Sequence, residues 1–418
     1  MPLILNSARL FFVTTALLCC SCSRDTTPES EAPSEPSPVV DLSPQAYEAT
    51  AEQLLSARLP DREAAEGWIR LFDGHTLYGW EIAGNANWRI EDQTLTADAG
   101  DVSLLCTSIP WTDYELSVQF KARSDTNSGV FLRTPLKVSD PATECYEVNI
   151  APDDNPFPTA SVVGRKKVPV DQVFDQWRTM VMRLQGDQLT VTLDGEVVCE
   201  LTDPAPVATG RIGLQKNSGR IEFRDVKLRP LGLQSLLGDG LDGWETYEEM
   251  PGEFKRTDDG SLRVVGGKTQ LETEDRFGDF NLLAEYKMDD VKSNSGIFFR
   301  CIPGDEMMGY ECQVSNEMND GNPLSPADCG AGGIFRRQDA RIIAGEPGKF
   351  NTILLATRGP RFTSWVNGIQ VTDVFDDRDP DPNPRRGLRL EPGTIMIQGH
   401  DATTDAIYKQ FKIRSFDP

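Results

Sequence analysis

Apolar and polar residues alternate along most of the chain, and this pattern predicts β-strands. Residues 114–120 alternate in this way, and residues 189–193 do so directly before an Asp194-Gly195 turn. Long stretches with the periodicity of a helix are absent from the sequence. Many short strands separated by turn residues are typical of all-β proteins, so the pattern predicts β-sandwiches of the jelly-roll type.

Residues 293–300 form a predicted strand with one face toward a core. Alternation would point Ile297 and Phe299 to one side, and it would point three residues to the other: Ser295, Phe298 and Arg300. In the strand predicted at residues 310–314, Glu311 and Gln313 share a face.

If these two strands pair, Arg300, Glu311 and Gln313 gather on one polar sheet surface. A charged pair flanked by an amide and aromatic residues suits a sugar or a similar polyol. The alternative is a solvated sheet face with a structural ion pair, since ion pairs are common there. The same pairing would place Cys301 and Cys312 on the core side, as buried free thiols.

The second half of the chain repeats the first half in the same order. The offset begins at 164 residues and widens toward the C-terminus, which is too long for a solenoid repeat and indicates a duplicated domain. The predicted domains are residues 67–231 and 232–418. The matching segments are residues 77–80 and 241–244, 113–116 and 279–282, 127–133 and 294–300, 146–149 and 310–313, and 213–215 and 396–398.

The two copies differ in residues that can carry chemistry. After Gln398 the second copy has Gly399-His400-Asp401, where the first copy has Lys216-Asn217-Ser218. The second copy also carries Arg336 in a glycine-rich, doubly basic segment. His400 is therefore the better histidine candidate for a general base, with Asp401 to orient it, although a lone histidine is more often structural.

The first 22 residues are predicted to be an export signal. Arg9 precedes the apolar run 10–18, and a cysteine cluster at residues 19–22 follows. The run is too short to span a bilayer. Its ending resembles a bacterial lipoprotein signal, so we expect Sec export and a lipidated Cys22, with Cys20 as the alternative. The expected location is the cell envelope, facing the periplasm or the cell surface.

Residues 23–66 are predicted to be a disordered tether followed by a short helix. Residues 23–40 are rich in Ser, Pro, Thr and Glu and cannot bury a core. Ser43 could cap a helix that has Pro44 at its first position and apolar residues at helical spacing up to residue 55. This helix is expected to pack on the first domain.

The chain is acidic, with 65 acidic and 42 basic residues and a net charge of -23. This balance argues against nucleic acid and against docking on anionic lipid headgroups, so a lipid anchor is the only membrane contact expected. The cysteines after the signal form no CxxC or Cys/His cluster, and no cofactor is expected. Glu311, His400 and Asp401 could bind a divalent metal, but a site without metal is preferred.

Both copies resemble the family of 3-keto-disaccharide hydrolases, or 3-keto-glucoside 1,2-lyases with 3-keto-2-hydroxy-glucal hydratase activity. The resemblance covers residues 67–231 and 236–416 and implies a concanavalin A-like jelly roll with its ligand on the concave sheet. The first copy departs from the family pattern at Asn149 and Lys216-Asn217, which implies a degenerate site. The motifs that carry the resemblance are residues 71–74 with 79–80, 127–133, 146–149, 294–300, 310–313 and 386–401.

The resemblance implies a reaction through the acidified C2 proton of a 3-keto sugar. That route needs a base, a group that stabilises the enolate oxygen and an acid for the leaving group. Glu311 or His400 is the expected base, Asp401 would orient His400, and Arg300 with Arg336 would hold the enolate charge. The expected substrate-binding residues are Asn294, Arg300, Gln313, Arg336 and Gln398. The alternative function is a non-catalytic surface glycan-binding protein with two lectin-like jelly rolls.

Overall fold

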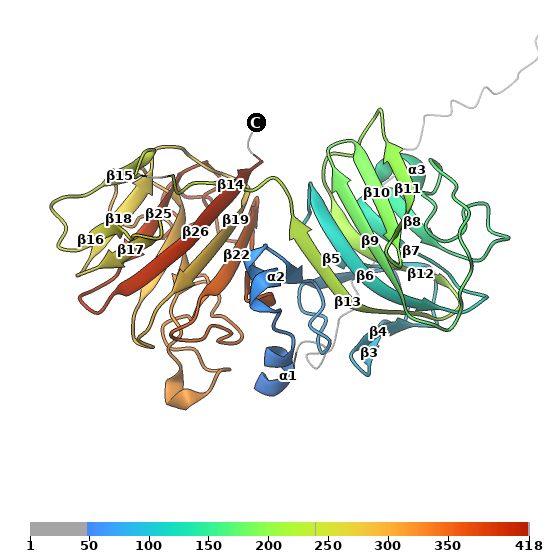
Figure 1. The fold of residues 1–418 in the computed structure, drawn as a ribbon, viewed down its shortest axis with the longest axis horizontal. Coiled ribbons are helices and arrows are strands. Elements are labelled where there is room, and N and C mark those ends of the chain that lie inside the picture. The colour runs from blue at the N-terminus through green and yellow to red at the C-terminus, as the bar shows by residue number, and fades with distance from the viewer. Residues whose placement is uncertain (1–47, 239, 417–418) are drawn as a thin grey trace, which may run out of the picture. The chain divides into compact units, whose positions relative to one another are not determined.

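The computed structural model describes residues 48–238 and 240–416 (Figure 1). Nearly all of its regular structure is β, arranged as two sandwiches in tandem. The predicted all-β fold of two tandem jelly rolls is therefore confirmed. The predicted signal with Cys22 and the predicted tether at residues 23–40 lie outside the described residues.

The first sandwich packs an eight-stranded sheet on a five-stranded sheet. The eight-stranded sheet contains, in spatial order, β11 (Glu196–Thr202), β10 (Gln188–Leu193), β9 (Arg178–Gln185), β6 (Tyr114–Ala122), β13 (Ile221–Pro230), β4 (Thr94–Ala97) and β3 (Arg89–Glu91), with β1 (Ile69–Arg70) also paired to β13. The five-stranded sheet contains β2 (Trp80–Ala83), β5 (Ser103–Thr107), β12 (Arg211–Ser218), β7 (Asn127–Thr134) and β8 (Tyr146–Ile150).

The second sandwich repeats this arrangement. Its eight-stranded sheet contains β16 (Glu253–Arg256), β17 (Leu262–Val265), β26 (Asp405–Ser415), β19 (Phe280–Lys287), β22 (Asn351–Arg358), β23 (Arg361–Val366) and β24 (Ile369–Phe375), with β14 (Gln234–Ser235) paired to β26. Its five-stranded sheet contains β15 (Trp244–Thr246), β18 (Thr269–Thr273), β25 (Thr394–Gly399), β20 (Ser295–Cys301) and β21 (Tyr310–Val314). The matching strand order supports a duplicated domain.

The two eight-stranded sheets differ in how they are covered. In β6, buried and half-buried residues alternate, as expected for a sheet with one face in a core. In β19 and β22, almost every residue is buried. Leu283 and Leu354 belong to the first core cluster together with Trp365, whose indole donates a hydrogen bond to Arg70 O at 3.0 Å. Packing against the first copy therefore covers the second face of this sheet.

The helices before the first sandwich are short and differ from the prediction. The described part of the predicted helix begins later, at α1 (Ala51–Ser56), because Thr50 and Gln53 form a capping box; residues 48–50 are not helical. The proposed cap at Ser43 lies outside the described residues. Leu54 and Ala57 join the second core, so the apolar side of this helix packs on the second domain rather than on the first, to which the helix end is joined by a hydrogen bond from Arg70 to Ala57 O. The other short helical elements are α2 (Asp61–Ala65), α3 (Pro141–Glu144) and the 3₁₀ turn η2 (Asn319–Gly321).

Candidate functional site

The candidate site lies on the face of the sheet β15-β18-β25-β20-β21 that points away from the core, which we call the second-copy face. Antiparallel pairing of β20 with β21 is confirmed, with Phe298 opposite Glu311 and Gly296 opposite Gln313. Pairing with β25 and β18 extends two rows of side chains across four strands. The rows are Glu272, Met396, Phe298 and Glu311, and Gln270, Gln398, Gly296 and Gln313.

Glu311 is a buried carboxyl group with few partners. Burial raises the pKa of Glu311 to about 7, an effect that nearby Arg385 partly opposes. Arg385 Nη2 lies 3.7 Å from Glu311 Oε2, beyond hydrogen-bond distance, and the described residues give the carboxyl group no hydrogen bond. A buried carboxyl group that is half-protonated near neutral pH is suited to proton transfer.

Gly296 allows two side-chain oxygens to approach from neighbouring strands. A Cβ atom at this position would lie 2.9 Å from Glu311 Oε1 and 3.1 Å from Gln398 Oε1. Gln398 Oε1 is buried and has no hydrogen-bond partner among the described residues, while its Nε2 lies 3.3 Å from Met307 Sδ. The amide of Gln398 is therefore incompletely satisfied beside the carboxyl group, which is unusual for a purely structural contact.

Asn294 and Gln313 lie at one edge of the second-copy face and are hydrogen-bonded to each other. Gln313 Nε2 donates to Asn294 Oδ1 at 2.9 Å, and Asn294 Nδ2 donates to Asp328 Oδ2 at 2.8 Å. The charge of Asp328 also raises the pKa of Glu311, although less than burial does. Gln313 Oε1 is buried without a partner among the described residues. This edge therefore offers a second unused acceptor.

His400 lies just beyond the end of β25 and is exposed. Its Nδ1 is 2.9 Å from Asp401 Oδ2, so the predicted pairing of these two side chains is observed. Hydrogen bonds from Thr403 and His400 lower the pKa of Asp401 to about 2. Asp401 is therefore ionised at neutral pH and can orient the imidazole ring. His400 is near enough for its charge to act on Glu311.

Arg300 does not lie on the second-copy face, so its predicted clustering with Glu311 and Gln313 is wrong. Its backbone has φ 49°, and the pairing of β20 with β25 shifts register at this point. This bulge turns the guanidinium group inward, where Nη2 lies 2.8 Å from Asp279 Oδ1 and the group lies over the Phe362 ring. Arg300 is fully buried and holds the two sheets together.

The same bulge changes the side on which Cys301 lies. Cys301 packs with Phe298 and Met396, whereas Cys312 lies in the core, so placing both thiols on the core side is wrong. Ser295 shares the core side with Ile297 and Phe299, because alternate residues of a strand point to the same face, so its predicted position beside Phe298 is wrong; its Oγ lies 2.7 Å from the hydroxyl oxygen of the core residue Tyr408. All six cysteines in the described part of the chain are buried and free.

The basic residue nearest to Glu311 is Arg385, which the sequence prediction did not include. It lies in the segment 376–393 between β24 and β25, and its guanidinium group lies over the Phe298 ring. The corresponding segment of the first copy is residues 203–210. The widening of the repeat offset toward the C-terminus was the signal that the second copy had gained a segment here. Arg336 is exposed, and its charge acts on Glu311 less than that of Arg385.

Two parts of the chain, residues 67–229 and 232–414, match the family model described as the 3-keto-alpha-glucoside-1,2-lyase-like domain. The chain belongs to this family. The resemblance seen in the sequence motifs is thereby confirmed, including its two tandem copies. No curated protein sequence matches the chain.

Solved structures similar to this family member have low sequence identity. Two candidate glycosyl hydrolases from Parabacteroides distasonis have 18% and 22% identity and TM-scores of 0.38 and 0.36. They cover 42% and 44% of this chain, and 99% and 100% of their own chains are matched. The carbohydrate-binding module CBM66 of Bacillus subtilis has 18% identity and a TM-score of 0.29, with 36% and 95% coverage.

The two side chains of the family motif Tyr310-Glu311 point to opposite faces of β21. Glu311 points to the second-copy face, while the Tyr310 hydroxyl donates to Asp376 Oδ2 at 2.7 Å and accepts from Arg389 N at 2.9 Å. These bonds join both ends of the segment 376–393. Tyr310 therefore fixes the segment that brings Arg385 to Glu311.

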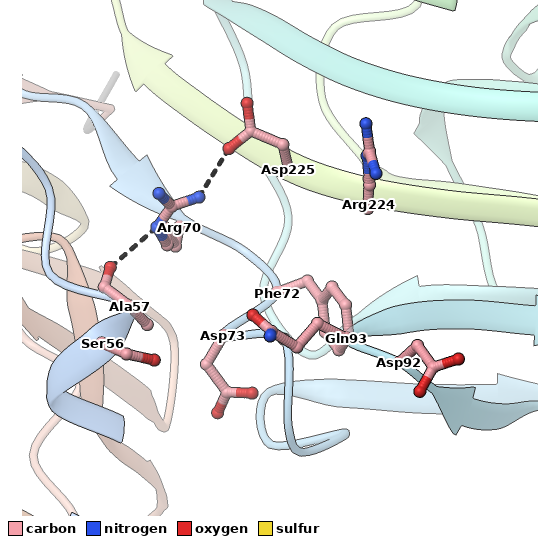
Figure 2. A pocket seen from close by; sticks show the side chains of 10 residues that line it. Ser56, Ala57, Arg70, Phe72, Asp73, Asp92, Gln93, Arg224 and Asp225 are labelled. Carbon is pink, nitrogen blue, oxygen red and sulfur yellow. Dashed lines mark hydrogen bonds and ion pairs between the residues drawn. The ribbon is translucent and has the colours of Figure 1, made fainter. Parts of the chain in front are cut away.

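A separate pocket of about 300 Å³ in the family member lies next to α1 and the first sandwich (Figure 2). Arg70 lies within it, but its guanidinium group donates to Ala57 O at 2.7 Å and to Asp225 Oδ1 at 2.6 Å. Asp73 likewise accepts bonds from Thr76 and Arg341. Because these charged groups satisfy one another, the pocket is a weaker candidate for the site.

No group of three or more His, Cys, Asp and Glu side chains in the described residues could hold a metal ion. No helix in residues 48–238 and 240–416 is long and apolar enough to cross a membrane.

Proposed function

We propose that the protein cleaves the glycosidic bond of 3-keto-glucosides or 3-keto-disaccharides, with Glu311 as the base. Membership of the lyase-like family supports this class of reaction. The observation that carries the proposal is the carboxyl group of Glu311, which is buried, lacks a hydrogen bond from the described residues and has a pKa of about 7. Such a group can take a proton from carbon near neutral pH.

The reaction divides into an elimination and a hydration. Glu311 takes the C2 proton, which the neighbouring C3 ketone acidifies, and the electron pair passes into an enolate. The enolate re-forms the ketone as the C1–O bond breaks, and the departing oxygen takes a proton. Water then adds across the resulting C1–C2 double bond, so that the net result is hydrolysis. An oxocarbenium ion is not needed, and therefore neither is a pair of carboxylates facing the anomeric carbon.

The side chains around Glu311 divide the remaining tasks. Arg385, and not Arg300 as the sequence suggested, is the cation that stabilises the enolate oxygen. The more exposed Arg336 adds a second positive charge. The pair His400–Asp401 lies just beyond the end of β25, where it can protonate the departing oxygen. The unpaired oxygens of Gln398 and Gln313 are acceptors for sugar hydroxyls.

We expect Glu311→Gln to lower turnover of 4-nitrophenyl 3-keto-α-glucoside by a factor of about 10²–10⁴, because the base is lost while the shape is kept. Release of 4-nitrophenol measures the rate. Glu147→Gln, the matched change in the first copy, should have little effect. Equal losses in both variants would place catalysis in both copies. Full activity of Glu311→Gln would exclude Glu311 as the base, whereas no turnover by the unsubstituted protein would favour the glycan-binding alternative.

We also propose that the protein is exported and anchored to the cell envelope through a lipid on Cys22. The apolar run at residues 10–18 and the cysteines that follow it support this proposal. Mass spectrometry of the protein purified from membranes should find a diacylglyceryl-modified cysteine at the N-terminus. Cys22→Ala should move the protein to the soluble fraction, whereas Cys20→Ala should not. An unmodified N-terminus beyond residue 22 would contradict the anchor.

A further inference from the structure

The five-stranded sheet of the first copy carries polar residues on the face that points away from the core. We call this face of the sheet β2-β5-β12-β7-β8 the first-copy face. Its rows are Cys106, Gly213, Phe131 and Glu147, and Leu104, Gln215, Gly129 and Asn149. Compared with the second copy, the rows keep Phe131, Glu147, Gln215 and Gly129 in equivalent places.

Several of these groups are buried without internal partners. Gln215 Oε1 and Asn149 Oδ1 are buried and have no hydrogen-bond partner among the described residues. A Cβ atom at Gly129 would lie 3.2 Å from Glu147 Oε1, so glycine lets the buried carboxyl group lie against the neighbouring strand, as Gly296 does for Glu311. Buried polar atoms without a partner in the chain call for water or a ligand, and on this face they lie beside the buried carboxyl group of Glu147.

The first-copy face lacks the cations that the proposed reaction uses. Burial raises the pKa of Glu147 to about 7, and the only opposing influence is hydrogen bonding by Gln215. Arg385, Arg336 and His400 act on Glu311 but have no counterpart near Glu147 in the described part of the chain. Without a cation, an enolate would not be stabilised here.

Two other positions in these rows are apolar in the first copy and polar in the second. Leu104 and Cys106 occupy the places that Gln270 and Glu272 hold in the second copy, and they pack with Phe131 in an apolar cluster. The face therefore combines neutral hydrogen-bonding groups with an apolar strip. This combination matches an uncharged sugar ring that carries hydroxyl groups on one edge and an apolar aglycone on the other.

We infer that the first-copy face is a second, non-catalytic binding site for a neutral glycoside, with Glu147, Gln215 and Asn149 on the sugar and Leu104 on the aglycone. The choice of a glycoside rests on the proposed function. The site requires no 3-keto group, because this face has no cation in the described residues to stabilise the enolate that a 3-keto group would form. It therefore binds the unoxidised glycoside as well.

The test measures how many ligand molecules bind to each molecule of the full-length protein. Isothermal titration with 4-nitrophenyl α-glucoside, which cannot be cleaved through a 3-ketone, should show two sites in the unsubstituted protein. Gln215→Ala should weaken one of them at least tenfold, and Gln398→Ala, the matched change, should weaken the other. Thermal unfolding verifies that each variant is folded, and Asn149→Ala serves as a second variant if Gln215→Ala fails to fold.

The outcomes separate this inference from the proposed reaction. A single site that disappears in Gln398→Ala and is unchanged in Gln215→Ala and Asn149→Ala would overturn the inference, and so would the absence of any binding. Turnover of the 3-keto-glucoside is measured separately on the unsubstituted protein. Two binding sites without turnover would leave the inference standing and remove the proposed reaction.

Discussion

At the scale of single residues, Glu311 and Glu147 show how one environment can serve two purposes. Both carboxyl groups are buried at the same point of the repeated sheet, and burial raises both pKa values to about 7. In the part of the chain that the structure describes, an arginine lies beside Glu311, Arg385 at 3.7 Å, and none lies beside Glu147. The neighbour, rather than the carboxyl group itself, therefore distinguishes the proposed catalytic copy from the proposed binding copy.

The raised pKa of Glu311 makes stability depend on pH. The ordinary pKa of 4.5 applies in the unfolded chain and about 7 in the folded chain, so the folded state binds more protons between these values. Stability should therefore fall as the pH rises from about 4.5 through 7. The difference corresponds to ~3 kcal/mol at most. Glu311→Gln removes this loss, so its free energy of unfolding should exceed that of the unsubstituted protein at about pH 8 but hardly differ at about pH 4.5.

Urea unfolding at several pH values measures this dependence. Glu147→Gln should behave in the same way, since its carboxyl group is buried equally and has no basic partner in the described residues. Glu196→Gln, at an exposed position of β11, should show no such dependence. A Glu311→Gln variant that is less stable at about pH 8 would mean that the carboxylate makes a stabilising contact in the folded state.

At the scale of strands, one bulge in β20 and the irregular segment 376–393 decide which residues reach the second-copy face. Alternation correctly placed Glu311 and Gln313 on one face of β21, because that strand is regular. It failed in β20, where φ 49° at Arg300 reverses the sides of Arg300 and Cys301. A sequence pattern of period two contains no information on such an extra residue. Arg385 was missed for a related reason, since it lies in an irregular segment that is much longer than the corresponding segment of the first copy, residues 203–210.

Arg300 should contribute to stability rather than to turnover. Its guanidinium group is fully buried, where it pairs with the half-buried Asp279 and donates to two backbone carbonyl groups, so Arg300→Met removes all of these hydrogen bonds from a buried position and should cost about 3 kcal/mol. Arg133 makes the matching contact with Asp113 at 2.7 Å in the first copy, and Arg133→Met should cost a similar amount. Urea unfolding measures both. A stable Arg300→Met variant without turnover would return Arg300 to the site.

At the scale of the whole molecule, the repeat in the sequence was the most informative feature. It predicted two sandwiches of equal topology, because each repeated motif marks the same strand in both copies. It did not predict that the copies share packing. Leu283 and Leu354 are ordinary strand residues in the sequence, and only the structure shows that they and Trp365 join the first core. Contacts of this kind depend on the relative position of two sheets, which alternation within a strand does not determine.

This shared packing leads to an expectation for a cut chain. Cleavage between residues 230 and 240 should leave two fragments that elute together in size-exclusion chromatography, because Trp365 lies against Trp111, with ring centroids 5.7 Å apart, and Arg341 pairs with Asp73 at 2.9 Å. Trp365→Ala removes a buried ring, should cost about 3–5 kcal/mol and should let the fragments separate. Trp88→Ala, a change beside Phe223 within the first sandwich, should destabilise that fragment without releasing it from its partner. If the unsubstituted fragments separate as folded monomers, the shared packing contributes little to stability, and each sandwich is an independent domain.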